Sequence, residues 1–230
     1  MKLNEIIGVI FDFNGTMFFD SKKHIEAWKL YIEEITGLEL TQKNVERYIV
    51  NKPGKSIIEH YLGYEVNDEI LEQLTEEKES IYRRLCKEDK NMLALAPGLE
   101  QFLDYLTDNN IPITIATTAN MSNVMFYFEQ FDLYKWFDPE KVVYKTKKIK
   151  DKPFPDMYLV ACKMINLHPS RCLVFEDSVA GITAAENAGI KNIVAVNGDN
   201  KMLNVDGFDN VRFVIEDYTA LGENLLDYKV

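Results

Sequence analysis

Short apolar runs alternate with longer helical patterns along most of the chain. The apolar runs read GVIFDF, ITIAT, VVY, CLVFED, NIVAV and VRFVI. They are almost continuously hydrophobic, which is typical of strands buried on both faces of a parallel sheet. The segments between them have helical apolar spacing: GLEQFLDYLTDNN, NMSNVMFYFEQFD, PDMYLVACKMINL and AGITAAENAG. This order predicts an α/β fold, with a doubly wound parallel sheet and right-handed crossovers.

The pattern changes between about residues 21 and 90, where no strand is predicted. The helical patterns in this stretch are KKHIEAWKLYIEEITG, TQKNVERYIV, KSIIEHYLG and NDEILEQLTEEKESIYRRLCKE, and NKPG at residues 51–54 is a turn. An all-helical insert after the first strand is most simply a separate cap. We therefore expect an α/β core domain formed by residues 1–18 and 91–230, and a helical cap domain formed by residues 19–90.

Composition and charge exclude several classes of protein. The formal net charge of −11 argues against nucleic acid as a partner, because phosphate backbones attract Lys and Arg. The 3 cysteines, Cys86, Cys162 and Cys172, form neither a disulfide framework nor a zinc pattern, which favours a reducing compartment. The first apolar run is too short for a signal peptide, and no run is long enough to span a membrane. We expect a soluble cytoplasmic protein that is a monomer or weak dimer.

Polar side chains follow several of the predicted strands, at the point where each strand ends. They are Asp12, Thr117, Thr118, Glu176 and Asp177, and Lys152 follows the third predicted strand in the segment DKPFPD. In open parallel sheets ligands bind beyond the carboxyl ends of the strands, so these side chains are expected to meet at one edge. Asp12 alone would be an ordinary turn or capping residue, and Lys152 alone could belong to the basic surface run KTKKIKDK. Acids and hydroxyls at several strand ends together indicate a functional site.

The chemistry of these side chains suggests a bound cation. Carboxylates crowded at one site repel each other, and such an arrangement usually needs a positive ion. Oxygen ligands without Cys or His nearby favour a hard ion, so Mg²⁺ is the expected cofactor. An acidic chain that binds phosphate needs such an ion or a local concentration of Lys and Arg.

Four motifs in order give the chain a family resemblance. The motifs are DFNGTMFFDS, IATT, DKPFPD and FEDSVAGITAAENAG. The chain resembles the haloacid dehalogenase superfamily, whose first motif is usually DxDGT, and within it the subgroup of β-phosphoglucomutase and its phosphatase relatives. The resemblance covers nearly the whole chain. It implies a Rossmann-like core of the haloacid dehalogenase type with an inserted helical cap.

The resemblance also implies roles for individual residues. Asp12 would be the nucleophile that takes a phosphoryl group and forms an aspartyl-phosphate. Mg²⁺ would be held by the Asp12 carboxylate, the backbone carbonyl of Asn14 and the Asp177 carboxylate, with Glu176 as a further ligand or water-holding residue. The phosphoryl oxygens would be held by Thr117, by Lys152, which also tethers Asp12, and by backbone N–H groups around Gly15 and Thr118.

Asn14 departs from the family pattern. The family has an aspartate here that protonates the leaving group and later activates water, and an amide does neither at neutral pH. Three explanations are open. The substitution is engineered to trap an intermediate, or it is natural and leaves a slow enzyme or a phosphosugar-binding protein. In the third, another group such as His24 transfers the proton. Deamidation at Asn14-Gly15, which would regenerate some aspartate, is a further hypothesis.

The resemblance implies that cap residues select the substrate. His24 matches a histidine that faces the site in the mutase subgroup, although an ordinary surface histidine is an equally good interpretation. Lys55 and Lys78 are candidates for contacts to a second phosphate or a sugar hydroxyl. The alternative interpretation is that both are exposed lysines on the cap surface. A phosphonatase would need a cap lysine that forms a Schiff base, and nothing beyond the presence of Lys55 favours that reaction.

These observations lead to one expected function and two alternatives. We expect a Mg²⁺-dependent phosphohydrolase of a small phosphorylated metabolite, most simply a sugar phosphate. The first alternative is a β-phosphoglucomutase-like phosphotransferase. The second, from another class, is a catalytically weak phosphometabolite-binding or regulatory protein. A dehalogenase is disfavoured because the acidic pair Glu176-Asp177 implies a metal that carbon–halogen cleavage does not require.

Overall fold

A computed structural model describes residues 8–50, 52–199 and 203–221. The chain divides into two compact units. One unit is formed by Met1–Phe19 and Ala94–Val230, and the other by Asp20–Leu93. Asn51 of the predicted NKPG turn lies outside the described residues.

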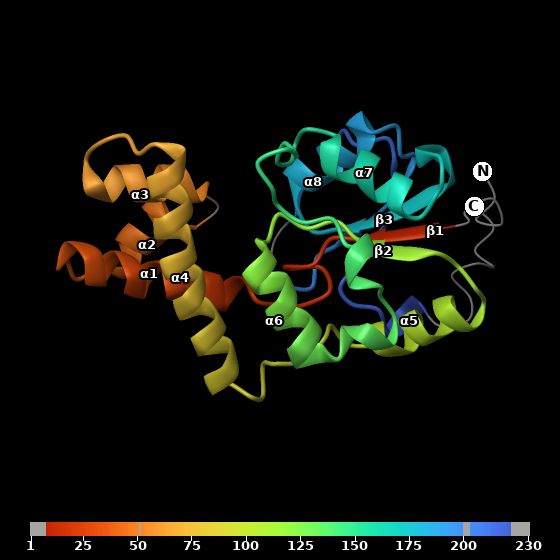
Figure 1. The fold of residues 1–230 in the computed structure, drawn as a ribbon, viewed down its shortest axis with the longest axis horizontal. Coiled ribbons are helices and arrows are strands. Elements are labelled where there is room, and N and C mark those ends of the chain that lie inside the picture. The colour runs from red at the N-terminus through yellow and green to blue at the C-terminus, as the bar shows by residue number, and fades with distance from the viewer. Residues whose placement is uncertain (1–7, 51, 200–202, 222–230) are drawn as a thin grey trace. The chain divides into compact units, whose positions relative to one another are not determined.

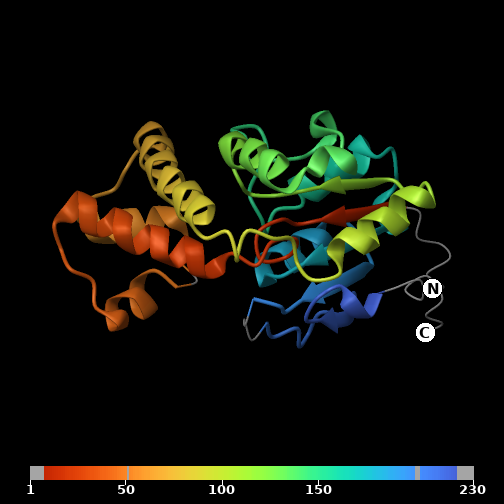
Figure 2. The same ribbon diagram turned by 90° about the horizontal axis from the view of Figure 1, so that it is seen from below.

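The first unit contains a parallel sheet of 5 strands in the order β2-β1-β3-β4-β5 (Figures 1 and 2). The strands are β1 Gly8–Phe11, β2 Ile113–Ile115, β3 Cys172–Glu176, β4 Asn192–Val196 and β5 Val211–Ile215. β1, β3 and β4 are buried along their whole length, as their continuous apolar sequences predict. β5 lies at the edge and alternates between exposed and half-buried positions. The predicted fold class is therefore confirmed.

Helices cover both faces of this sheet. In Figure 1, α7 (Asp156–Met164) and α8 (Val179–Asn187) lie on one face, and α5 (Leu99–Asp108) and α6 (Met121–Phe131) on the other. Successive residues of β1 serve the two faces, as the pleat of a strand requires. Ile10 packs in the cluster that includes residues of α7 and α8, whereas Phe11 meets Phe102 of α5. The short 3₁₀ helices are η2 Leu133–Lys135, η3 Pro139–Lys141, η4 Pro169–Arg171 and η5 Thr219–Leu221.

The strand predicted at VVY is wrong. Residues 142–144 follow the 3₁₀ helix η3 and make a single bridge, between Val143 and Ala116. Two backbone hydrogen bonds form there, from Val143 N–H to the Ile115 carbonyl and from Thr117 N–H to the Val143 carbonyl. The apolar, β-branched sequence is explained by burial of Val142 and Val143 beside β2 rather than by a strand.

The second unit consists of helices joined by short loops, with no strand among its described residues. Its helices are α1 Ser21–Thr36, α2 Gln42–Tyr48, α3 Gly54–Leu62 and α4 Asp68–Glu88. α1 ends at Gly37, whose φ of 69° is the left-handed conformation that closes a helix. Thr41 and Asn67 directly precede α2 and α4 and cap them, because their side chains accept hydrogen bonds from backbone N–H groups of the first turn. Tyr31, Ile32, Leu40, Val45, Ile49 and Ile57 form the buried core of this unit.

Of the helices in the described part of the chain, none combines the length and apolar character that crossing a bilayer requires.

Candidate active site

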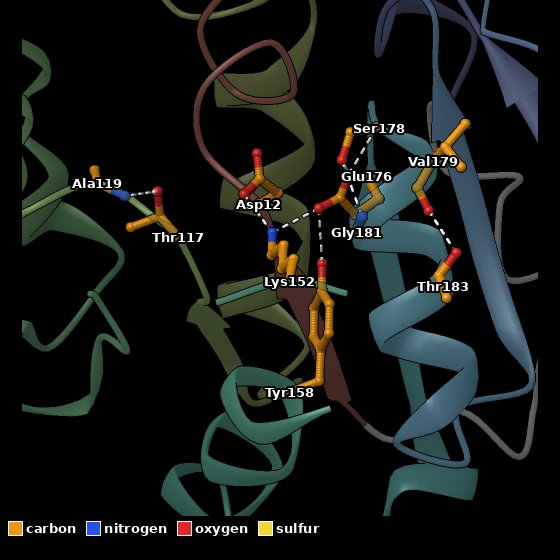
Figure 3. Close-up of polar contacts among 10 residues, drawn as sticks. All are labelled: Asp12, Thr117, Ala119, Lys152, Tyr158, Glu176, Ser178, Val179, Gly181 and Thr183. Atoms are coloured by element: carbon orange, nitrogen blue, oxygen red, sulfur yellow. Dashed lines mark hydrogen bonds and ion pairs between the residues drawn. The ribbon is translucent and has the colours of Figure 1, made fainter. Parts of the chain in front are cut away.

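Strands β1 and β3 bring three acidic side chains to the carboxyl end of the sheet. Figure 3 shows two of them, Asp12 and Glu176. β1 ends directly before Asp12, and β3 ends at Glu176, which Asp177 follows. The two strands are held together as far as this point, because the Asp12 N–H donates to the Phe175 carbonyl at 3.0 Å. Asp12 and Asp177 are each 6% exposed and Glu176 is fully buried. Parallel pairing therefore places three carboxylates together in a region largely closed to water.

Lys152 binds two of these acids. Its Nζ lies 2.6 Å from Asp12 Oδ1 and 2.5 Å from Glu176 Oε1 (Figure 3). The Lys152 side chain is 5% exposed, so it does not belong to the solvated basic run that precedes it. A buried ammonium between two carboxylates is strongly attracted to both, and its three N–H donors fix their orientation.

Glu176 is bound on both of its oxygens by protein donors. Oε1 accepts from Lys152 and from the Tyr158 hydroxyl, which lies 3.1 Å away. Oε2 accepts from Ser178 through its backbone N–H at 2.8 Å and its hydroxyl at 3.0 Å. These contacts join Glu176 to Lys152, to Tyr158 and to the start of α8, and its expected role as a metal ligand or water-holding residue stays a prediction.

The sequence did not identify Tyr158 and Ser178 as site residues. Tyr158 lies on the apolar face of the helix predicted from PDMYLVACKMINL, where it resembles a core residue. A signal was nevertheless present for both residues. A buried tyrosine needs a partner for its hydroxyl, and a serine directly after two acids is a typical helix N-cap. Ser178 does cap α8, because its hydroxyl accepts from the Gly181 N–H at 3.0 Å.

Gly181 leaves the space that the Glu176 carboxylate occupies. A Cβ at this position would overlap the Glu176 side chain. We therefore expect Gly181→Ala to destabilise the protein by about 1–3 kcal/mol, as overpacking does, although alanine is the better helix former. Urea unfolding measures this change. The control is Val179→Ala, at an exposed position of the same turn, and it is expected within about 0.5 kcal/mol of the parent. An unchanged free energy of unfolding for Gly181→Ala would show that Glu176 can move without loss.

The electrostatics of the site follow from burial and from an excess of negative charge. Burial raises the pKa of Asp12 to about 8, Lys152 opposes this rise, and the Glu176 and Asp177 carboxylates add to it. Burial lowers the pKa of Lys152, but Asp12 and Glu176 outweigh this effect and hold it well above its usual value. Three acids face one ammonium, so the site favours a further positive charge.

The donors of the site suit a small hard cation. Asp12 and Asp177 offer carboxylate oxygens and Asn14 offers a backbone carbonyl, which are the ligands that Mg²⁺ prefers. Among the described residues no group of three or more His, Cys, Asp and Glu side chains is arranged as a metal centre.

The turn after β1 carries Asn14 and Gly15. Gly15 has a φ of 79°, and its N–H donates to the Phe18 carbonyl at 2.7 Å. Glycine adopts this left-handed conformation without a steric penalty, which explains the residue type. The side-chain nitrogen of Asn14 donates to the Tyr127 hydroxyl at 2.7 Å, a contact that no sequence spacing indicated.

The end of β2 carries the two threonines. Backbone pairing from Ala116 N–H to the Phe11 carbonyl at 2.8 Å places this end beside β1. Thr117 is buried, and its hydroxyl accepts from the Ala119 N–H at 3.1 Å. Thr118 is exposed.

Comparison with known proteins identifies the family. The sequence profile described as haloacid dehalogenase-like hydrolase matches residues 6–189. The chain belongs to this family. It is 29% identical over 192 residues to "Phosphorylated carbohydrates phosphatase" of Thermotoga maritima, covering 82% of this chain and 84% of that protein. It is 28% identical over 207 residues to "Beta-phosphoglucomutase" of Bacillus subtilis, covering 86% of each.

A solved structure supports the same assignment. The crystal structure of a haloacid dehalogenase hydrolase, family IA, variant 3, from Entamoeba histolytica has a TM-score of 0.87 and 32% sequence identity, covering 96% of this chain and 97% of that one. The predicted resemblance to the β-phosphoglucomutase-like branch of the family, and to a hydrolase, is thus confirmed.

Within the helical unit, two of the three cap residues expected to bind substrate contact each other. Lys78 Nζ lies 2.8 Å from His24 Nδ1 and 2.8 Å from Glu79 Oε1. The Lys78 side chain is 2% exposed and lies over the Trp28 ring, 5.0 Å from its centroid. His24 Nε2 lies 3.2 Å from Asp20 Oδ2. The interpretation of Lys78 as an exposed cap lysine is therefore wrong.

Lys55 has different surroundings. It lies on α3, its side chain is 49% exposed, and its Nζ is 3.7 Å from Glu59 Oε1 on the next turn of the same helix. Surface pairs of this kind contribute little to stability, so Lys55 can exchange this partner for another at small cost.

Proposed function

We propose that the protein is a Mg²⁺-dependent phosphatase of small phosphorylated carbohydrates, with Asp12 as the nucleophile. The observation that carries the proposal is the buried contact of Lys152 with Asp12 at the carboxyl end of β1. The ammonium opposes the rise that burial causes in the pKa of Asp12, which favours the ionised, nucleophilic carboxylate, and it fixes the direction of that carboxylate. The family to which the chain belongs supports this assignment.

In the first step an oxygen of Asp12 attacks the phosphorus atom. The new bond joins this oxygen to phosphorus, the bond from phosphorus to the sugar oxygen breaks, and an aspartyl-phosphate forms. The departing sugar oxygen takes its proton from water, because the Asn14 amide does not supply one. Lys152 would neutralise charge on one phosphoryl oxygen and Thr117 would donate a hydrogen bond to another. Backbone N–H groups near Gly15 and Thr118 would bind the remaining oxygen. Bound Mg²⁺, held by Asp12, Asp177 and the Asn14 carbonyl, would shield the negative charges of the nucleophile and the phosphate.

In the second step water breaks the aspartyl-phosphate. The residue at position 14 would normally take a proton from this water, but an amide only donates or accepts a hydrogen bond. General acid–base catalysis contributes about 10²–10⁴-fold, so both leaving-group departure and hydrolysis are expected to be slow. This property also favours the second candidate function, a phosphometabolite-binding protein with weak turnover.

The substrate class rests on the relatives. The Thermotoga maritima protein is named a phosphatase of phosphorylated carbohydrates, and the Bacillus subtilis protein is named β-phosphoglucomutase. Both names refer to phosphate esters of sugars. A phosphatase and a phosphotransferase would therefore share the attacking residue, Asp12, and would differ in whether water or a sugar accepts the phosphoryl group. His24, Lys55 and Lys78 are the candidates for contacts to the sugar.

A panel of phosphorylated metabolites tests the proposal directly. We expect release of inorganic phosphate from one or more sugar phosphates with Mg²⁺, and none after treatment with EDTA. Conversion of one sugar phosphate isomer into another without phosphate release would favour the mutase. Tight binding of a sugar phosphate with no turnover, seen by calorimetry, would favour the binding protein.

A further inference from the structure

The side chain of Asn14 makes a contact that the steps above do not use. Its Nδ2 lies 2.7 Å from the hydroxyl oxygen of Tyr127, and the two residues are 113 positions apart in the chain. The contact therefore joins the turn after β1 to helix α6. It is a tertiary feature of this fold and not a consequence of local sequence.

Packing fixes the Tyr127 hydroxyl. Tyr127 is 1% exposed, and its ring stacks on Phe13 with centroids 4.1 Å apart and planes 14° apart. Ile115, Thr117 and Val124 surround the same small space as Phe13 and Tyr127. A buried, stacked ring has no room to swing, so the phenol oxygen has one position.

The backbone around Asn14 is fixed as well. Residues 13–18 form a closed turn, with hydrogen bonds from Gly15 N–H to the Phe18 carbonyl and from Met17 N–H to the Phe13 carbonyl. Asn14 also makes a bridge with Phe18. With both ends of the contact held, the Asn14 amide nitrogen is directed at the Tyr127 hydroxyl.

We propose that Tyr127 is a positioning residue that sets the orientation of the Asn14 amide. This inference rests on the proposed function. With Nδ2 bound to Tyr127, Oδ1 of Asn14 accepts a hydrogen bond from the water that attacks the aspartyl-phosphate. The water oxygen then bonds to phosphorus, the bond from phosphorus to Asp12 breaks, and the water proton passes to a phosphate oxygen because the amide does not take it. Asn14 orients the water, and Tyr127 orients Asn14.

The kinetic test is a double-mutant cycle with Mg²⁺ and an aryl phosphate. Tyr127→Phe keeps the stacked ring and removes only the hydroxyl. We expect it to lower kcat about three- to tenfold, the value of one neutral hydrogen bond, with KM within about twofold of the parent. In an Asn14→Ala background the same change should alter kcat by less than about twofold, because the coupled partner is absent. The control is Tyr134→Phe, which removes the hydroxyl of a half-exposed tyrosine in η2, and it should leave kcat unchanged.

A second measurement is independent of turnover. The side-chain NH₂ signals of Asn14 are assigned in a nitrogen-15 spectrum by their disappearance in Asn14→Asp. We expect Tyr127→Phe to shift these signals and to speed their exchange with solvent, and Tyr134→Phe to leave them in place. Unshifted signals in Tyr127→Phe would overturn the inference, as would equal effects of Tyr127→Phe with and without the Asn14 side chain. The absence of phosphate release from every variant, with shifted signals, would instead contradict the proposed function.

Discussion

Replacing Asp12 by asparagine is expected to abolish phosphate release. The carboxylate oxygen is the attacking atom, and an amide oxygen is a poor nucleophile toward phosphorus. Loss of a nucleophile lowers kcat by about 10⁴–10⁶-fold or more in enzymes where it has been removed. The side chains are nearly the same size, and Oδ1 can still accept from Lys152, so the fold should persist. A steady-state assay with an aryl phosphate measures the loss.

A matched substitution elsewhere in the same unit separates chemistry from folding. Asp132 ends α6 with a φ of 49°, a conformation that asparagine adopts readily. Asp132→Asn makes the same chemical change on an exposed residue and should retain parental activity. Parental turnover in Asp12→Asn would exclude Asp12 as the nucleophile and, with it, the proposed mechanism.

The covalent intermediate provides a direct readout. With an aryl phosphate, whose leaving group departs without being protonated, Asn14 is expected to slow only hydrolysis, so the aspartyl-phosphate should accumulate in the parent chain during turnover. Acid quenching followed by peptide mass spectrometry should find one added phosphoryl group on the peptide that contains Asp12. Asp12→Asn should carry none. A phosphoryl group on a different residue would assign the nucleophile elsewhere.

Much of the fold follows from the sequence because burial leaves a direct pattern. Strands β1, β3 and β4 are covered on both faces, and their unbroken apolar runs indicate this. VVY has the same local character, yet only Val143 forms a bridge. The difference lies in tertiary pairing, since a buried loop beside an edge strand and a short strand need the same residue types.

The site was predictable only in part. Asp12 and Lys152 were identified from the ends of predicted strands and from the family motifs, and the structure brings them together. The contacts of Glu176 with Tyr158, and of Asn14 with Tyr127, join residues whose spacing carries no signal. Both tyrosines lie in apolar helical patterns, and the spacing of apolar residues does not indicate whether a tyrosine hydroxyl has a polar partner. Their partners depend on how helices α6 and α7 pack on the sheet.

Replacing Asn14 by aspartate is expected to raise turnover by about 10²–10⁴-fold, the usual contribution of general acid–base catalysis. The carboxyl group would protonate the sugar oxygen as it departs and then take a proton from the attacking water. The carboxylate would also keep a partner, because the Tyr127 hydroxyl can turn to donate to it. Metal binding should change little, since the ligand at position 14 is a backbone carbonyl.

The control for this gain adds the same charge at a remote position. Asn204 is exposed and accepts a hydrogen bond from the Asp206 N–H at 2.8 Å, which an aspartate would preserve. Asn204→Asp should therefore have parental activity. Peptide mass spectra of the parent must show intact Asn14, so that deamidated enzyme does not contribute to its rate. Equal rates for the parent and Asn14→Asp would show that position 14 does not transfer the proton. Turnover in neither chain, with tight sugar-phosphate binding in both, would identify a sensor built on a hydrolase fold.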